Sequence, residues 1–124
     1  MYKEAILDAV SMHELPSKWH SDVLKEAKNA TKKKKASKYR QDLRKLPFIT
    51  IDGEDAKDFD DAIYCSATNN GFHLKVAIAD VSYYVKEGSS INKEASKRTT
   101  SVYFPQKVVP MLPENLSNEL CSLQ

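Results

Sequence analysis

The chain has 124 residues, of which 41% are hydrophobic, 29% charged and 9% aromatic, and its formal net charge at pH 7 is +2. This length and composition are typical of one soluble globular domain and exclude a fibrous or disordered chain. The N-terminus is too polar for a signal peptide, and no apolar run reaches the roughly 20 residues that a membrane span needs. We therefore expect an intracellular, cytoplasmic protein without a membrane partner.

The first forty-odd residues are predicted to be largely helical and basic. Pro16 interrupts the pattern, and Ser21 is a candidate N-cap with Asp22 in the first turn. Residues 25–45 hold ten Lys or Arg against two acidic residues. The densest run has two interpretations, a solvated loop or frayed helix end and a contact surface for phosphates. That run comprises Lys32, Lys33, Lys34 and Lys35.

From Leu46 onward the pattern changes to that of β-strands. The stretch "FITI" alternates, "DAIYCSA" is rich in β-forming residues, and "NNG" at residues 69–71 is a hairpin signal. In "FHLKVAI" apolar and other side chains alternate, which predicts a half-buried strand with His73 on the solvent side. The face predicted to be buried comprises Phe72, Leu74, Val76 and Ile78.

The hairpin turn predicts a register. If Asn70 and Gly71 are the two central turn residues, Asp61 lies opposite Asp80, and two opposed like charges require a cation or a basic side chain nearby. A three-residue loop would shift this pairing. Asp80 on its own is expected to be a hydrogen-bonding residue at the end of the strand.

Two helices are predicted after the hairpin. Asn92 is expected to cap a short helix, and Pro113 is expected to begin another whose apolar stripe packs in the core. That stripe comprises Leu116, Leu120 and Leu123. Together the elements predict an α+β fold, an antiparallel sheet with flanking helices. Cys65 and Cys121 are far apart without a Cys-x-x-Cys pattern, which argues against structural zinc and a disulfide framework.

Residues 52–61, which we call the acidic loop, hold six acidic residues and one lysine. Carboxylates at this density repel one another unless cations neutralise them or their pKa values rise. Oxygen ligands favour Mg²⁺, Mn²⁺ or Ca²⁺. An EF-hand calcium loop is excluded, because Gly53 directly follows Asp52 and the twelfth position is Ile63 instead of Glu.

The spacing within the acidic loop leaves two interpretations. Asp58 and Asp60 share one face of an extended backbone while Asp61 points to the other, and a turn at Gly53 would return the first two toward Asp52. Such a cluster suits phosphoryl hydrolysis with two metal ions, in which one ion activates a water and the other stabilises the leaving oxygen. Spacing alone does not separate this hypothesis from a solvated acidic loop.

Three segments occur in order along the chain, "TIDGEDAKDFDDAIYC", "VAIADVSYYV" and "TSVYFPQKVVPMLPENLSNELCSL". Together they resemble the catalytic RNB module of the ribonuclease II/ribonuclease R family, from about "HELPSKW" to the last residue. The resemblance implies a processive 3′-to-5′ exoribonuclease that hydrolyses single-stranded RNA to nucleoside 5′-monophosphates. It implies Mg²⁺ as cofactor, with Mn²⁺ able to substitute. No obligate protein partner is evident from the sequence.

The resemblance also implies roles for individual residues. Asp52 and Asp58 look like metal ligands, Asp60 like the residue most critical for turnover, and Asp61 like a ligand or its support. All four are therefore expected to be catalytic and metal-binding. Tyr103, in "SVYFP", resembles a tyrosine that stacks on a base near the 3′ end of the RNA, an interaction that tolerates any base because every base has a π face.

The same resemblance divides the chain into a basic helical connector over residues 1–45 and the N-terminal portion of a truncated RNB domain over residues 46–124. Family members carry further catalytic residues beyond this portion, so we expect the isolated chain to be inactive or nearly so. The alternative is a non-catalytic RNA- or metal-binding module. It would keep the front half of the fold and use residues 25–45 to contact phosphates.

Overall fold

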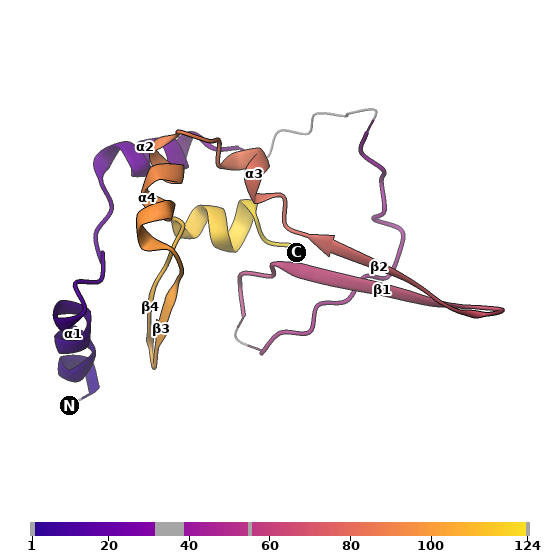
Figure 1. Ribbon diagram of the computed structural model, residues 1–124, viewed down its shortest axis with the longest axis horizontal. Helices are drawn as coiled ribbons and strands as arrows, with labels where there is room; N and C mark the ends of the chain where they lie inside the picture. Colours follow the sequence, from indigo (N-terminus) through magenta and orange to yellow (C-terminus); the bar gives the residue numbers. More distant parts are fainter. Residues whose placement is uncertain (1, 32–38, 55, 124) are drawn as a thin grey trace.

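The computed structural model describes residues 2–31, 39–54 and 56–123 (Figure 1). Within these residues lie helices α1 (Tyr2–Met12), α2 (Ser21–Asn29), α3 (Val81–Tyr84) and α4 (Ser90–Arg98), and a π-helical turn η1 (Leu116–Leu120). Strands β1 (Asp61–Thr68) and β2 (Gly71–Ile78) form one antiparallel hairpin, and β3 (Val102–Phe104) and β4 (Lys107–Val109) form another. The expected α+β fold, with antiparallel strands and flanking helices, is confirmed.

The core lies among α2, α4 and the C-terminal segment. Figure 1 shows these helices together with η1, while the β1–β2 hairpin extends away from them. Ile91 of α4 and Leu116 of η1 are almost fully buried, and Leu120 packs against the same cluster. Of the apolar stripe expected after Pro113, Leu116 and Leu120 are therefore confirmed as core, whereas Leu123 is half-buried and lies outside this cluster. In the part of the chain that the structure describes, no helix is long and apolar enough to span a bilayer.

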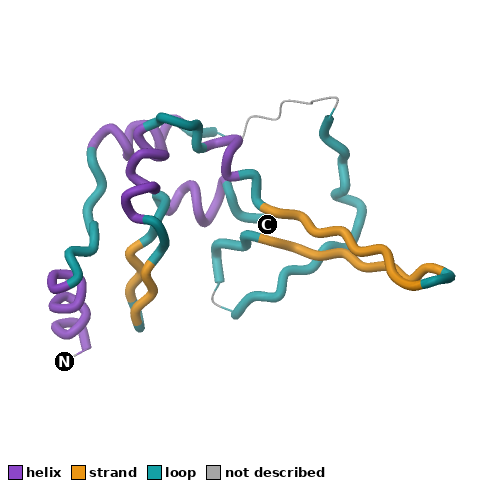
Figure 2. The backbone as a smooth tube through the Cα atoms, viewed as in Figure 1, coloured by secondary structure: helices purple, strands orange, loops and turns teal. Residues whose placement is uncertain are grey.

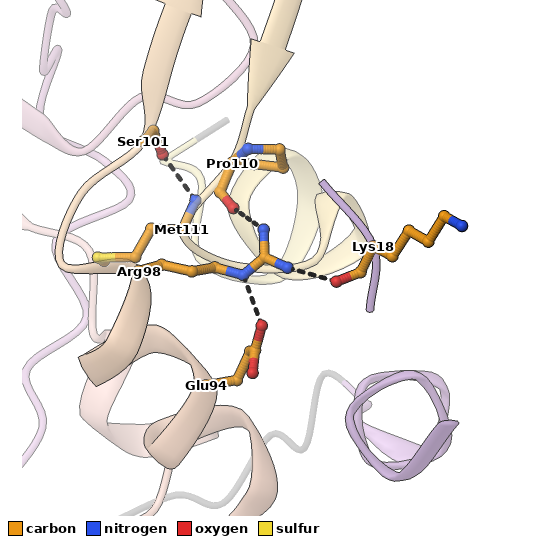
Figure 3. A network of polar contacts seen from close by, with 6 residues as sticks. All are labelled: Lys18, Glu94, Arg98, Ser101, Pro110 and Met111. Atoms are coloured by element: carbon orange, nitrogen blue, oxygen red, sulfur yellow. Dashed lines mark hydrogen bonds and ion pairs between the residues drawn. The ribbon is translucent and has the colours of Figure 1, made fainter. Parts of the chain in front are cut away.

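A buried arginine joins three segments of this core (Figure 3). The Arg98 guanidinium donates from Nε to Glu94 Oε1 at 2.9 Å and from its two terminal nitrogens to the backbone oxygens of Pro110 and Lys18, at 3.0 and 2.8 Å. Its central carbon lies 3.5 Å from the centre of the Trp19 ring. One side chain thus connects α4, the segment before α2 and the segment after β4.

Two predicted helix caps are wrong by one to three residues. Helix α2 begins at Ser21 itself, and the preceding His20 has an extended backbone and makes no side-chain capping bond. In α4 the cap is Ser89, whose Oγ accepts the backbone N–H of Asn92 at 3.2 Å. Asn92 is therefore the third helical residue, the position whose amide a serine cap satisfies. Its own side chain accepts the Gly88 N–H.

The predicted hairpin register is also wrong. Thr68 pairs with Gly71 and Asp61 with Ile78, so the central turn residues are 69 and 70 and no two aspartates oppose each other across this hairpin. Gly71 begins β2 with φ of 150°, a conformation that glycine adopts at little cost and other residues rarely take. Asp80 lies beyond the strand.

The expectation for Asp80 alone is confirmed. Its carboxylate accepts from the Arg40 guanidinium and from Ser82 Oγ, and the Arg40 hydrogen bond is the main cause that lowers the pKa of this carboxyl. The basic side chain expected near Asp80 is therefore Arg40. The strand predicted for "FITI" is reduced to one antiparallel bridge, between Ile49 and Ile63.

The apolar face of β2 is not buried by the described residues. Phe72, Leu74, Val76 and Ile78 remain 79%, 57%, 55% and 67% exposed, which contradicts the predicted burial, while His73 is exposed as expected. Alternation along a strand identifies its apolar face, but burial requires a second layer that packs on that face. Contiguous apolar surface of this kind promotes association.

We expect the isolated chain to self-associate through this face. Replacing Leu74 and Val76 with lysine removes two exposed apolar side chains and adds charge that opposes close approach of two copies. Sedimentation velocity over a range of concentrations should show association that this double variant lacks. Leu7→Lys on α1, which is 56% exposed, is the matched control and should associate like the unaltered chain. Equal association of all three proteins would show that another surface is responsible.

Candidate active site

The acidic loop leads directly into β1, as Figure 2 shows for the segment that meets the base of the β1–β2 hairpin. Asp52 and Asp60 are exposed, Asp58 is half-buried, and Asp61 is the exposed first residue of β1. The four aspartates implied by the family resemblance are therefore all described and all reach the surface. Asp55 lies outside the described residues.

Hydrogen bonds from the C-terminal segment hold the middle of the acidic loop. Ser122 Oγ accepts the Phe59 N–H at 3.1 Å and donates to the Lys57 carbonyl at 3.0 Å. The Leu123 N–H donates to the Phe59 carbonyl at 3.0 Å, and the Ala79 N–H donates to the Asp60 carbonyl at 2.8 Å. The backbone on both sides of Asp58 is thus tied to residues more than sixty positions away.

The charges of the four aspartates act on one another. Partial burial raises the pKa of Asp60, and the negative charges of Asp58, Asp52 and Asp61 raise it further. All three are therefore close enough for their fields to reach the Asp60 carboxyl. Among the described residues, however, no three acidic, histidine or cysteine side chains converge closely enough to hold one metal ion.

Partial burial and this repulsion together predict a pH-dependent effect of Asp60→Asn on stability. A raised pKa means that the folded chain holds the Asp60 proton more tightly than the unfolded chain, so ionisation of Asp60 lowers stability as the pH rises through the folded pKa. Below the ordinary value of 3.8 the carboxyl is protonated in both states. Asp60→Asn should therefore raise Tm at pH 7 and leave it unchanged at about pH 3.

Thermal unfolding followed by circular dichroism measures both values. Asp8→Asn, on the exposed surface of α1, changes the net charge equally and is the control. A Tm of Asp60→Asn at or below that of the unaltered chain at pH 7 would contradict the repulsion inferred for the acidic loop.

Tyr103 lies against the acidic loop. It is the middle residue of β3, its side chain is 65% exposed, and its hydroxyl donates to Asp58 Oδ2 at 3.1 Å. Partial burial of the phenol group and this hydrogen bond raise the pKa of Tyr103. The ring is thus held at its hydroxyl end and remains open to solvent over most of its surface, which suits a flat aromatic ligand.

A hollow of about 380 Å³ lies beside Asp58 and Tyr103. Carboxylate, hydroxyl and amide groups line this hollow together with aliphatic side chains, so it offers polar partners next to the Tyr103 ring. The polar lining residues are Lys57, Asp58, Ser101, Tyr103, Glu114, Ser117 and Asn118.

The structure describes only part of the basic residues 25–45. Lys32, Lys33, Lys34 and Lys35, the predicted phosphate contacts, lie outside the described residues. Two arginines that follow them are paired with carboxylates, Arg40 with Asp80 and Arg44 with Asp42. These exposed pairs reduce the positive charge that residues 39–45 offer to a polyanion.

Two contacts at the site carry no signal in the sequence. Ser122 was not a candidate residue, because nothing in "CSLQ" indicates that its hydroxyl reaches residues 57 and 59. Tyr103 was a candidate for base stacking alone, and its hydrogen bond to Asp58 joins residues 45 positions apart. Contacts of this range depend on the tertiary fold and have no periodicity to reveal them.

Comparison with known proteins gives consistent results. Residues 40–124 match the model of the RNB domain family. The chain is 53% identical over 118 residues to ribonuclease R of Vibrio cholerae and 52% identical over 118 residues to ribonuclease R of Escherichia coli. Each alignment covers 93% of this chain and 14% of the relative, so the chain spans about one seventh of the length of these curated relatives.

Solved structures show the same relationship. The structure of Mycoplasma genitalium RNase R in complex with double-stranded RNA matches with a TM-score of 0.92 and 41% identity, over 97% of this chain and 22% of that one. The complex of the same protein with ribose methylated single-stranded RNA matches with a TM-score of 0.90 and 41% identity, over 97% and 19%. The relatives named above are ribonucleases R, and the chain belongs to the RNB domain family.

Proposed function

We propose that the chain is the N-terminal portion of the RNB domain of a processive 3′-to-5′ exoribonuclease. Its substrate would be single-stranded RNA, its products nucleoside 5′-monophosphates, its cofactor Mg²⁺ and its location the cytoplasm. The observation that carries the proposal is the hydrogen bond between the Tyr103 hydroxyl and Asp58, at 3.1 Å. It joins a ring suited to base stacking to a carboxylate suited to metal binding, so a group that can hold an RNA base lies beside a group that can hold the ion which assists hydrolysis.

The chemistry of the donor set fits a hard cation. Asp52, Asp58, Asp60 and Asp61 offer only carboxylate oxygens, and a divalent cation would relieve the repulsion that raises the pKa of Asp60. When bound, Mg²⁺ supplies a water of lowered pKa and neutralises charge that develops on the phosphate. Since no three described side chains converge, completion of the site requires movement of the acidic loop or ligands from other residues.

The chain's own residues bind and orient. Asp58, held on both sides by Ser122 and at its carboxylate by Tyr103, would present its remaining oxygen lone pairs in a fixed direction. The exposed Tyr103 ring would stack on a base of the RNA and set the distance from that base to Asp58. The relatives solved in complex with RNA support an RNA substrate.

The experiment that tests this proposal restores the rest of the domain. This chain would replace the matching segment of Vibrio cholerae ribonuclease R, and the chimaera would be incubated with 5′-labelled single-stranded RNA in Mg²⁺ or in chelator. We expect a ladder that shortens from the 3′ end in Mg²⁺ and an unchanged band in chelator. An inactive chimaera that folds and binds RNA would contradict the proposal.

The alternative function, a non-catalytic RNA- or metal-binding module, is favoured by one observation, the failure of three described carboxylates to converge. It requires salt-sensitive RNA binding by the chain that survives Asp60→Asn. Both hypotheses leave RNA unshortened by the isolated chain, and only the exoribonuclease proposal requires that the chimaera gain activity.

A further inference from the structure

Asp58 owes its position to a serine from the other end of the chain. Ser122 Oγ accepts from the N–H of the residue after Asp58 and donates to the carbonyl of the residue before it. The same hydroxyl thus fixes both peptide units that flank the aspartate. The neighbouring Leu123 N–H adds a third bond, to the carbonyl of Phe59.

The segment that precedes Ser122 is packed in the core. It directly follows Cys121, which is 4% exposed, and η1, whose Leu116 is 0% exposed within the core cluster. Close packing in a core leaves such a segment little freedom to shift. The bonds of Ser122 therefore hold the middle of the acidic loop in a fixed position relative to the core.

The acidic loop has few other restraints among the described residues. One backbone bond, from the Ala56 N–H to the Gly53 carbonyl, lies within the loop, and the Ala79 N–H holds the Asp60 carbonyl at the entry to β1. The Tyr103 hydroxyl restrains the Asp58 carboxylate but not the backbone on either side of it. Four aspartates that repel one another favour an expanded loop. The Ser122 bonds oppose this expansion at Asp58, two residues before Asp60.

We propose that Ser122 is a positioning residue, which fixes the backbone on both sides of Asp58 so that Asp58 and Asp60 can take up a divalent cation once loop movement or further ligands complete the site. The inference rests on the proposed function of these aspartates. It assigns to Ser122 no contact with RNA or metal, because its hydroxyl is occupied by the backbone of Lys57 and Phe59. Groups that orient ligands from behind typically change metal affinity by about 10- to 100-fold when they are removed.

The test compares Ser122→Ala, Ser122→Thr and Ser96→Ala in this 124-residue chain. Alanine removes the hydroxyl, threonine retains it, and Ser96 is an exposed serine whose Oγ donates locally to the Asn92 carbonyl in α4. Three quantities are measured: the Kd for Mn²⁺ alone, by electron paramagnetic resonance, the hydrogen-exchange rate of the Phe59 amide, by NMR, and Tm.

We expect Ser122→Ala to weaken Mn²⁺ binding by at least about 10-fold and to speed exchange of the Phe59 amide by a similar factor, with little change in Tm. Ser122→Thr should restore both quantities, and Ser96→Ala should alter neither. A general structural role would instead lower Tm and speed exchange throughout the chain.

Three results would overturn the proposal: unchanged Mn²⁺ affinity in a folded Ser122→Ala variant, global unfolding of that variant by circular dichroism, or failure of threonine to restore affinity in a folded protein. If the unaltered chain binds no Mn²⁺, the metal part of the proposed function fails for this chain. The positioning role is then judged on the Phe59 amide, and it is overturned if exchange in Ser122→Ala equals that of the unaltered chain.

Discussion

Replacing Asp60 with asparagine in the chimaera with Vibrio cholerae ribonuclease R is expected to lower kcat by at least roughly 100-fold, the loss common when one preorganised electrostatic group is removed from a site. The affinity for single-stranded RNA should change little, because most of it comes from phosphate and stacking contacts elsewhere. Asp60→Asn keeps the size of the side chain and removes its charge. Single-turnover cleavage and filter binding, measured on the same protein, separate the two effects.

The matched control for this prediction is Glu54→Gln. Glu54 is exposed in the same acidic loop and undergoes the same change of carboxylate to amide, but the family resemblance gives it no role. It should keep kcat within about threefold, a difference of less than 1 kcal/mol in barrier height. Equal losses of kcat in the two variants would mean that turnover depends on the total charge of the loop and that Asp60 has no individual catalytic role. Normal turnover by Asp60→Asn would remove it from the catalytic set.

Asp60 also illustrates a conflict between activity and stability. The partial burial and neighbouring charges that raise its pKa make the folded chain less stable at neutral pH, so one substitution is expected to raise Tm and to lower turnover. The opposite signs of the two effects make Asp60→Asn more informative than either measurement alone.

Local patterns predicted much of this fold. The alternation in "FHLKVAI", the "NNG" turn and the leucine stripe after Pro113 each correspond to an element of the structure. These signals depend on residues only a few positions apart. The register was predicted from the turn alone, so placing the turn one position too late changed every predicted pair across the hairpin. The acidic loop was found for the same reason, since its aspartates are close in sequence.

Burial and long-range contacts were not predictable in this way. The apolar face of β2 was recognised, but its exposure depends on which layers the described chain supplies. The Ser122 bonds to residues 57 and 59 join positions more than sixty apart. A serine has no chemical preference for such a place, so its role follows only from the coordinates. The same holds for Arg98, whose contacts with Lys18 and Pro110 join segments far apart in the chain.

Arg98→Met is expected to lower the free energy of unfolding by roughly 3–5 kcal/mol, the cost of removing one partner from a buried ion pair. The guanidinium and Glu94 side chains are 2% and 9% exposed, so methionine leaves a carboxylate with no cation in a site that water hardly reaches. The carbonyls of Pro110 and Lys18 lose their donors, and the Trp19 ring loses its cationic neighbour. Urea unfolding followed by tryptophan fluorescence measures the change.

Companion variants separate the causes of this loss. Arg98→Lys keeps the charge, but its single ammonium nitrogen does not reach the three acceptors that the planar guanidinium fork reaches. Its free energy of unfolding should therefore lie between those of the unaltered chain and Arg98→Met. Adding Glu94→Leu to Arg98→Met removes the stranded carboxylate and should recover part of the stability, with a coupling that only contacting residues show. Arg44→Met breaks the exposed pair with Asp42 and should have almost no effect. If Arg98→Met unfolds at the same urea concentration as Arg44→Met, Arg98 does not hold the core together.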